Sequence, residues 1–404
     1  MIRCILFFFL CVCSAVAEPT LILTEASLAL RIHEQNPDLK AARWKIQEAL
    51  GKWQQAGRPS RPRVDWQWEQ TPDMREGQVK LGMSRSFPIT QRLTWEKEIS
   101  KSSLEAAEWE IRRAEQELIT EARLIFIQAL ALKSRRQCMV AQQVEAEAFA
   151  EEVKKNQQRA EASALDAAQA KLDAASLLIE QKQLDAQEVA LFTSLKKLLG
   201  MQPADTISAG GELPALHDAA SGNISQRADY QQALREVLRA RNTVQCELAS
   251  RFDDLEAGVY LSGMRMEDAP QGYRSDVMLG FQLSIPLPFW DDNSGNIAAA
   301  KAGVERRERE AQAIISQAQN EASGATAEMR EWKKLDQQIT GELLPLAEEQ
   351  LKLAQQAYAG GQGELATIFR ARAQKRQLTL ARIDARSSYH QSRIRSESAR
   401  AAQP

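Results

Sequence analysis

Cysteine, histidine and aromatic side chains are scarce in this sequence, and neither sign of charge is in excess. The 404 residues include five cysteines, three histidines and 6% aromatics, and 52 Lys and Arg against 54 Asp and Glu leave a formal net charge of -2. This balance excludes a protein that binds nucleic acid through a bulk basic excess. The three histidines, His33, His217 and His390, lack the spacing of metal ligands.

Long apolar runs are also missing from the body of the chain. The mean hydropathy is -0.42, and beyond the N-terminus no run approaches the ~20 residues that a transmembrane helix needs. A transporter built from membrane helices is therefore excluded, and any crossing of a membrane must use strands. No histidine beside a nucleophile and no paired carboxylates indicate catalysis, so we expect no enzyme, no cofactor and no bound metal.

The N-terminus has the layout of a secretory signal peptide. Arg3 precedes an apolar run from Cys4 to Val12, and Ser14-Ala15-Val16-Ala17 supplies an Ala-x-Ala cleavage site. A signal peptide over residues 1–17 fits this pattern better than a buried N-terminal helix. Only Cys138 and Cys246 then remain, too few for a disulfide framework, and the sequence does not decide whether the N-terminus is lipidated.

The mature chain repeats one order of elements. The first repeat, 18–205, is predicted to contain a helix over 24–56, a β-hairpin over 63–87, a long helix over 91–159 and a half-length helix over 165–199. Residues 206–223 form a linker. The second repeat, 224–404, is predicted to contain a helix over 225–249, a hairpin over 255–287 with its loop at 266–275, a long helix over 296–357 and a last helix ending near 400.

The long helices have the pattern of close helix packing. In the helix over 91–159, large apolar residues alternate with alanine at steps of three and four, which suits knobs-into-holes contacts. At 1.5 Å per residue this helix is about 100 Å long, so the helices form a tube rather than a globule. A cytoplasmic coiled-coil rod is the alternative, but it leaves the signal peptide and the hairpins unexplained.

The predicted strands alternate between apolar and polar residues over lengths that suit tilted strands crossing an outer membrane. A soluble β-subdomain packed on a helical bundle is the alternative. The residues expected to face lipid are Val64, Trp66, Trp68, Val79, Leu81, Met83, Val259, Leu261, Val277, Leu279, Phe281 and Leu283.

Four strands cannot close a barrel, and open strand edges cannot lie in lipid. Several chains must therefore contribute strands, and three chains would supply about 12. The aromatic residues expected at the membrane interface are Phe87, Trp95, Phe289 and Trp290. The predicted fold class is mainly α with a β-barrel portion: a long α-helical barrel and four transmembrane strands per chain, in two internal repeats that form a trimeric barrel.

Four segments resemble a known family. They are Ile285-Pro-Leu-Pro-Phe-Trp-Asp-Asp-Asn-Ser-Gly-Asn-Ile-Ala298, Asn36-Pro-Asp-Leu-Lys-Ala-Ala-Arg43, Arg227-Ala-Asp-Tyr230, and Tyr358 with the glycines that follow it. On these segments the chain resembles the outer-membrane efflux proteins of the TolC-like kind, nearest the heavy-metal efflux (CzcC-like) branch. The resemblance covers nearly the whole mature chain.

The resemblance implies a homotrimer with a shared barrel in the outer membrane of a Gram-negative bacterium and a helical tunnel through the periplasm. It also implies a passive exit duct that docks to a periplasmic adaptor and an inner-membrane pump. The turns between helices then form the periplasmic entrance that the adaptor contacts. The corresponding residues are Arg159, Ala160, Ser163 and Asp166 in the first repeat, and Gly360, Gly361, Gly363 and Glu364 in the second.

Two questions stay open at this stage. Asp166 and Glu364 either place carboxylates at the tunnel mouth, where they favour cations, or offset the dipoles of the helices that they begin. The sequence does not name the cargo, which is a metal ion, a drug or a polypeptide, and heavy metals are suggested by the resemblance alone. A periplasmic adaptor or a coiled-coil scaffold is the alternative function.

Overall fold

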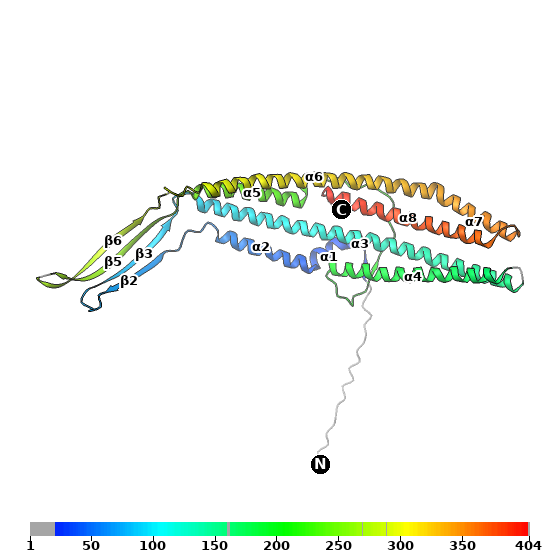
Figure 1. The fold of residues 1–404 in the computed structure, drawn as a ribbon, viewed down its shortest axis with the longest axis horizontal. Coiled ribbons are helices and arrows are strands. Elements are labelled where there is room, and N and C mark those ends of the chain that lie inside the picture. The colour runs from blue at the N-terminus through cyan, green and yellow to red at the C-terminus, as the bar shows by residue number, and fades with distance from the viewer. Residues whose placement is uncertain (1–20, 160–161, 269, 288, 403–404) are drawn as a thin grey trace, which may run out of the picture. The chain divides into compact units, whose positions relative to one another are not determined.

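The computed structural model describes residues 21–159, 162–268, 270–287 and 289–402 (Figure 1). The predicted signal peptide lies outside these residues. The chain divides into two compact units, and each takes segments from both predicted repeats. Unit 1 comprises residues up to Pro37, Glu117–Ala219 and Gly324–Ser396, and unit 2 comprises Asp38–Gln116, Ala220–Ser323 and the residues from Glu397 on.

Long helices and a small sheet make up the chain, as the predicted fold class requires. The helices are α1 (Glu25–Gln35), α2 (Pro37–Gln55), α3 (Arg92–Gln158), α4 (Ala164–Leu198), α5 (Ala228–Ala249), α6 (Ser294–Gln338), α7 (Leu344–Ala359) and α8 (Leu365–Ala399), with a 3-10 turn at Ile224–Gln226 and a π-helical segment at Ile339–Leu343. The strands are β1 (Leu21–Leu23), β2 (Arg63–Gln70), β3 (Gly77–Phe87), β4 (Ile207–Ala209), β5 (Leu255–Asp268) and β6 (Gly272–Ser284).

The segment 24–56, expected as one helix, forms two. Pro37 disfavours helical backbone at the residue before it, and Asn36 accordingly leaves the helix at φ -58° and ψ 123°. Its buried side chain donates a hydrogen bond from Nδ2 to the carbonyl of Leu198 at 2.7 Å. The break between α1 and α2 therefore fastens the end of α1 to the end of α4.

The core of unit 1 gathers around two short strands that the sequence analysis missed. Strands β1 and β4 pair in parallel, with Leu21 opposite Ile207. Beside them, Gly200 has φ +64° at the end of α4, and an added Cβ would lie 2.5 Å from the carbonyl oxygen of Gln35. Only glycine fits such a close approach with positive φ. Further buried apolar clusters of unit 1 lie between its helices. The buried cluster around the two strands contains Leu23, Leu28, Ile32, Ala122, Phe126, Ile127, Ala129, Leu130, Leu195, Leu198, Leu199, Ile207, Ala209 and Ile394.

The helical wall predicted over 296–357 is continuous but contains a π-helical turn. Upstream of this turn, residues spaced by seven are buried: Ala311, Ala318 and Ala325, and also Ala322, Met329 and Asp336. Downstream, Ala347 and Ala354 are buried, eight and fifteen residues after the buried Ile339, whereas Leu346 and Leu353 are exposed. The π turn thus adds one residue to the repeat, and it lies just before Pro345, which lacks the N–H of a regular helix.

The main sheet lies in unit 2, where Figure 1 shows its two hairpins side by side. Its strand order is β2-β3-β5-β6, with each neighbouring pair antiparallel. The first turn falls where it was predicted, between Gln70 and Gly77. The predicted loop at 266–275 is wrong, because β5 and β6 pair as far as Asp268 and Gly272.

Candidate functional site

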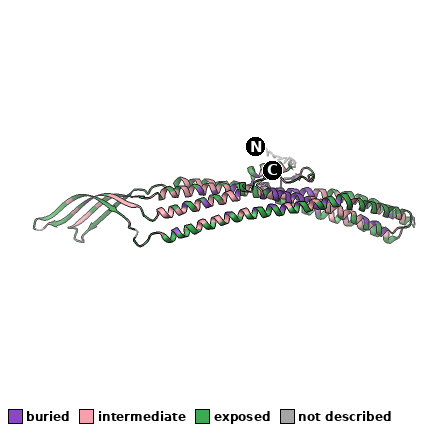
Figure 2. Ribbon diagram, turned by 90° about the horizontal axis from the view of Figure 1, so that it is seen from above, coloured by how far each residue is buried: buried purple, intermediate pink, exposed green. Residues whose placement is uncertain are grey.

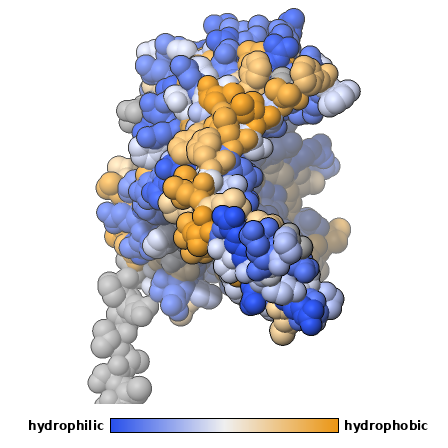
Figure 3. All heavy atoms as spheres, turned by 90° about the vertical axis from the view of Figure 1, so that its left-hand side faces the viewer, coloured by the Kyte–Doolittle hydropathy of each residue, from blue (hydrophilic) through white to orange (hydrophobic). Residues whose placement is uncertain are grey.

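One face of the main sheet carries all of the residues predicted to face lipid. The pairing register aligns them in rows across the strands; Trp66, Leu81, Leu261 and Leu279 form one such row. Their side chains lie open within the chain, with exposed fractions from 46% at Val79 to 81% at Leu279. Figure 2 colours most strand residues as exposed or intermediate, and Figure 3, which views this end of the molecule, shows the hydrophobic atoms gathered in one band. A contiguous apolar surface of this kind marks contact with a membrane or a partner.

The reverse face of the sheet is polar and hollowed. A hollow of about 330 Å³ is lined by side chains that include Asp65, Gln67, Lys80, Glu256 and Gln282. The hydroxyl of Ser84 donates to Oδ2 of Asp65 at 2.8 Å, between β3 and β2. The sheet therefore separates an apolar surface from a polar, hydrogen-bonded one.

Tyr260 lies at the centre of this polar face, and the sequence analysis did not single it out. Its cross-strand neighbours are Gly82 on β3 and Gly280 on β6. A Cβ added at Gly280 would come within 2.3 Å of the Tyr260 ring, so the ring lies flat over that glycine. The Nζ of Lys80 stands 3.9 Å from the ring centroid, in the geometry of a cation–π contact. Gly82 and Gly280, which leave space beside Tyr260, are the feature of the sequence that could have indicated this site.

The predicted interfacial aromatics lie where each hairpin joins a helix. Phe87 ends β3 and is 45% exposed, whereas Trp95 lies in the first turn of α3 and is partly buried. Phe289 and Trp290, 73% and 97% exposed, pack edge to face with ring centroids 6.2 Å apart. Asn293, which follows at φ 59°, donates from Nδ2 to the Glu247 carbonyl at 2.9 Å and so holds this segment to the end of α5.

The turn before α4 is closed by a capping box. Ser163 accepts from the amide of Asp166 at 3.0 Å, and the Asp166 carboxylate accepts from the amide of Ser163 at 3.2 Å. Asp166 thus caps the start of α4. This supports the interpretation that its carboxylate offsets the helix dipole, rather than the one that places it at the tunnel mouth to favour cations. Arg159 lies exposed at the end of α3, and Ala160 lies outside the residues that the structure describes.

The turn before α8 is built from glycines. Gly360 caps α7, and Gly361 follows with φ +71°. A Cβ at Gly363 would lie 2.9 Å from the amide nitrogen of Tyr358, so this position also needs glycine. Glu364 is exposed immediately before α8, and its carbonyl accepts from the amide of Thr367 at 3.0 Å.

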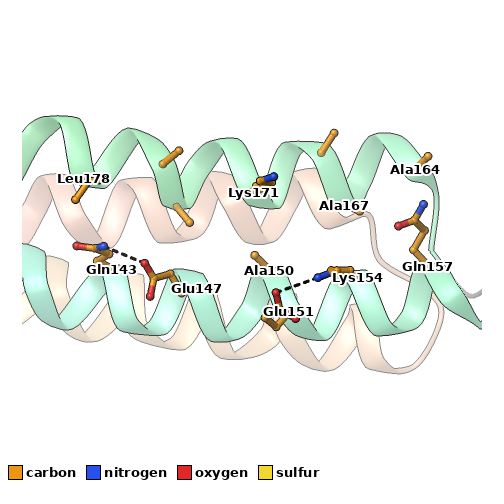
Figure 4. Close-up of a pocket in the computed structure, with 13 residues that line it drawn as sticks. Gln143, Glu147, Ala150, Glu151, Lys154, Gln157, Ala164, Ala167, Lys171 and Leu178 are labelled. Atoms are coloured by element: carbon orange, nitrogen blue, oxygen red, sulfur yellow. Dashed lines mark hydrogen bonds and ion pairs between the residues drawn. The ribbon is translucent and has the colours of Figure 1, made fainter.

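Behind the first turn, α3 and α4 enclose a groove of about 720 Å³ with an alanine floor. Figure 4 shows Ala150 on α3 and Ala164 and Ala167 on α4 lining it. Its rim carries charge: Lys154 lies 3.4 Å from Glu151, and further polar rim residues are Gln143, Glu147, Gln157 and Lys171.

A second groove, of about 910 Å³, lies between α3 and the hairpin of α7 and α8. The guanidinium carbon of Arg372 lies 4.0 Å from the centroid of Phe149, which packs edge to face on Phe369 at 5.9 Å. Burial lowers the pKa of Arg372, against the opposing effect of nearby carboxylates. Burial and the charges of Asp166 and Glu152 raise the pKa of Tyr358, also in this groove. Neither groove was predicted from the sequence.

Two further findings concern the described part of the chain. None of its helices combines the length and the apolar character needed to cross a membrane. Within the same residues, His, Cys, Asp and Glu side chains form no group of three or more that could hold a metal ion.

Known structures share this arrangement. No family model matches the sequence, and no curated protein does. Among solved structures, the outer-membrane channel OprN aligns with 94% of this chain and 90% of its own at a TM-score of 0.77 and 16% identity. The outer membrane protein VceC of Vibrio cholerae aligns over 93% and 95% at 0.76 and 16%, and CusC, which forms a transmembrane channel, over 94% and 93% at 0.74 and 18%. The chain therefore has the fold of the TolC-like outer-membrane channels.

Proposed function

We propose that this protein is the outer-membrane channel of a tripartite efflux system and serves as a passive exit duct. The observation that carries the proposal is the two-faced sheet, which is apolar and open on one side and polar on the other. Lipid covers the apolar face, and water fills the space beside the polar face. Energy for transport comes from an inner-membrane pump, and no catalytic activity is assigned to this chain.

A homotrimer gives each edge strand of the sheet a pairing partner. Strands β2 and β6 are the edge strands of the four-stranded sheet, and unpaired backbone groups at such edges are too costly to leave in lipid. Pairing β6 of one chain with β2 of the next closes a barrel of about 12 strands from three chains. Phe87, Trp95, Phe289 and Trp290 then lie at the periplasmic interface of the outer membrane.

The two helical turns form the periplasmic entrance in this proposal, where a periplasmic adaptor docks. Arg159, Ala160, Ser163 and Asp166 belong to one turn, and Gly360, Gly361, Gly363 and Glu364 to the other. The capping box fixes the start of α4, and Gly361 has a positive φ in the second turn. The two grooves behind the turns offer surfaces for helices of a partner.

Heavy-metal cations are the proposed cargo on the strength of the sequence resemblance. A passive duct need not coordinate what passes through it, so the proposal requires no metal ligands in this chain. A periplasmic adaptor or coiled-coil scaffold is the competing function, but it gives no role to an exposed apolar face backed by a polar one.

Three experiments test the proposal. The purified protein in planar lipid bilayers is expected to open discrete conducting channels, and urea is not expected to extract it from membranes. Absence of conductance together with extraction by urea alone would refute the duct. For the cargo, a deletion strain is exposed to divalent metals and to organic toxins. Unchanged tolerance to every metal would refute the metal cargo while leaving the duct intact.

A further inference from the structure

A short segment of unit 1 follows β4 and lies against α8 without forming a helix or strand of its own. We call residues Leu213–Ala219 the strap. Its Pro214 carbonyl accepts a hydrogen bond from Nε2 of His390 at 3.0 Å, and its His217 carbonyl accepts one from the Tyr389 hydroxyl at 2.9 Å. Arg393, one turn further along α8, donates to Nε2 of His217. Three neighbouring residues of one helix therefore hold the strap.

Two of the three histidines of the chain meet at this contact, with ring centroids 5.9 Å apart. His390 is fully buried, and its Nδ1 has no hydrogen-bond partner. In His217, Nδ1 lies 2.8 Å from the Ala215 carbonyl and acts as the donor, because Nε2 accepts from Arg393. The His390 ring thus donates from Nε2 and is held in its neutral form, with Nδ1 buried and without a partner.

The charges around the two rings disfavour an added proton. Arg393 is buried beside them, with one guanidinium nitrogen 3.8 Å from Glu25 of α1. That same carboxylate lies 2.7 Å from Arg123 of α3, so its charge is shared between two guanidinium groups. A proton on Nδ1 of His390 would be buried without an acceptor, and the charge of Arg393 would oppose it.

Two charged pairs lie near the strap. Asp218 of the strap lies 3.5 Å from Lys333 of α6. One turn before His390 on α8, Nε of Arg386 donates to Asp336 at 2.9 Å. Neither pair involves a histidine, the residue type whose ordinary pKa lies between pH 5 and 8.

We propose that the strap is an acid-released latch, closed on α8 while His390 is neutral and freed when that ring takes up a proton. Release leaves the covalent chain unchanged and exposes residues 213–219 together with the face of α8 that they cover. The inference concerns the link between β4 and α5 and does not depend on the proposed transport function.

The direction and size of the pH effect on strap opening follow from the lowered pKa of His390. Burial lowers the pKa of His390 from 6.5 to about 4, assisted by Arg393 and His217 and opposed by the Pro214 carbonyl and Glu25. A lowered pKa means that the closed strap has its full stability above pH 6.5 and loses it as the pH falls toward 4. If the freed ring has its ordinary pKa, the ratio of open to closed strap rises about 30-fold between neutral pH and pH 5.

Limited proteolysis of the full-length protein measures this ratio. Cleavage of an opened segment follows the population of the open form when opening is fast. The cleavage rate within residues 213–219 is divided at each pH by the rate for a free peptide of residues 210–222, which corrects for the activity of the protease. This corrected rate is expected to rise about 30-fold from pH 7.5 to pH 5.0, while cleavage in the loop at 202–205 stays constant.

Five variants make the test specific. Gln at position 390 keeps an amide donor for Pro214 but takes up no proton, so His390→Gln is expected to reduce the acid response to a few-fold change. His217→Gln is expected to weaken it, whereas the matched control His33→Gln, in α1, leaves it intact. No response in the wild-type protein would overturn the proposal. It would also fail if the His217→Gln/His390→Gln double variant kept the full response, or if Glu25→Gln alone removed it.

Discussion

The apolar face of the main sheet allows a test with two adjacent residues. Met278 and Leu279 are both exposed apolar side chains of β6, with exposed fractions of 46% and 81%. The register places Met278 opposite Ser262 on the polar face and Leu279 opposite Leu261 on the apolar face. Replacing each by arginine therefore gives two variants with the same new residue in the same strand, which differ in the face that carries the charge.

The free-energy cost of the new arginine is expected to be large only for the variant on the apolar face. An arginine facing lipid near the middle of the membrane costs about 2–4 kcal/mol per chain, and less near the interfaces. Because the proposed trimer contains the substitution three times, Leu279→Arg is expected to cost about 6–12 kcal/mol per assembly. Met278→Arg places its charge in water, and its cost is expected to stay within about 0.5 kcal/mol per chain.

The assay is folding into lipid vesicles, with the fraction of folded protein measured along a guanidinium series. Leu279→Arg is expected to shift the midpoint sharply to lower denaturant or to prevent insertion, while Met278→Arg folds like the wild-type protein. Equal behaviour of the two variants would refute the assignment of faces. Normal insertion of Leu279→Arg would refute the contact between this face and lipid.

Three further substitutions address other parts of the structure. Gly280→Val should lift the Tyr260 ring off the sheet, because the ring occupies the space of the new side chain; single-channel conductance falls, and overpacking costs about 1–3 kcal/mol. Ser163→Ala removes the cap of α4 at a cost of about 1 kcal/mol, so amide exchange in its first turn should rise about fivefold. Asp336→Ala leaves Arg382 and Arg386 of α8 without their shared carboxylate; the cost is about 1–3 kcal/mol, measured as a lower thermal midpoint.

Each of these substitutions has a matched control. Gly263→Val changes a glycine of the same sheet that has open space around it, and conductance should not change. Ser176→Ala removes a hydroxyl that bonds only a carbonyl of the preceding turn inside α4, so exchange at the first turn should stay as in the wild type. Glu331→Ala removes an exposed partner of Lys334, and the thermal midpoint should move little. If a control showed the same measured change as its test variant, the physical reason given for that variant would be wrong.

The sheet was largely predictable because its pattern is local. Alternation with a period of two assigns each side chain to a face, and a register slip by one residue would exchange the faces. The second turn was misplaced for a physical reason. Beyond Gly263 the outward positions of β5 are Arg265 and Glu267, so the apolar signal stops before the strand does.

Features that depend on distant contacts were not predictable. The three-residue strands β1 and β4 are too short to show a period, and they exist because segments far apart in the sequence meet. The capping box at Ser163 has a local signature, Ser followed by Asp three residues later. By contrast, the meeting of His217 with His390 joins residues 173 positions apart, and nothing in the spacing of the histidines indicates it.

The π-helical turn at Ile339–Leu343 shifts the repeat of buried positions by one residue between α6 and α7. Before the turn, buried side chains are separated by seven residues. Across the turn, the buried Ile339 and Ala347 are separated by eight. Removing one residue there, such as Gly341, would restore a regular repeat, because Ala347 and Ala354 would then lie seven and fourteen residues after Ile339 and stay inward. Substituting Pro345 would not have this effect, because the extra residue would remain. Any alignment of this wall with a helix that lacks the turn therefore needs a one-residue gap between Ile339 and Leu344, and a heptad pattern fitted across it without that gap exchanges inward and outward positions in α7.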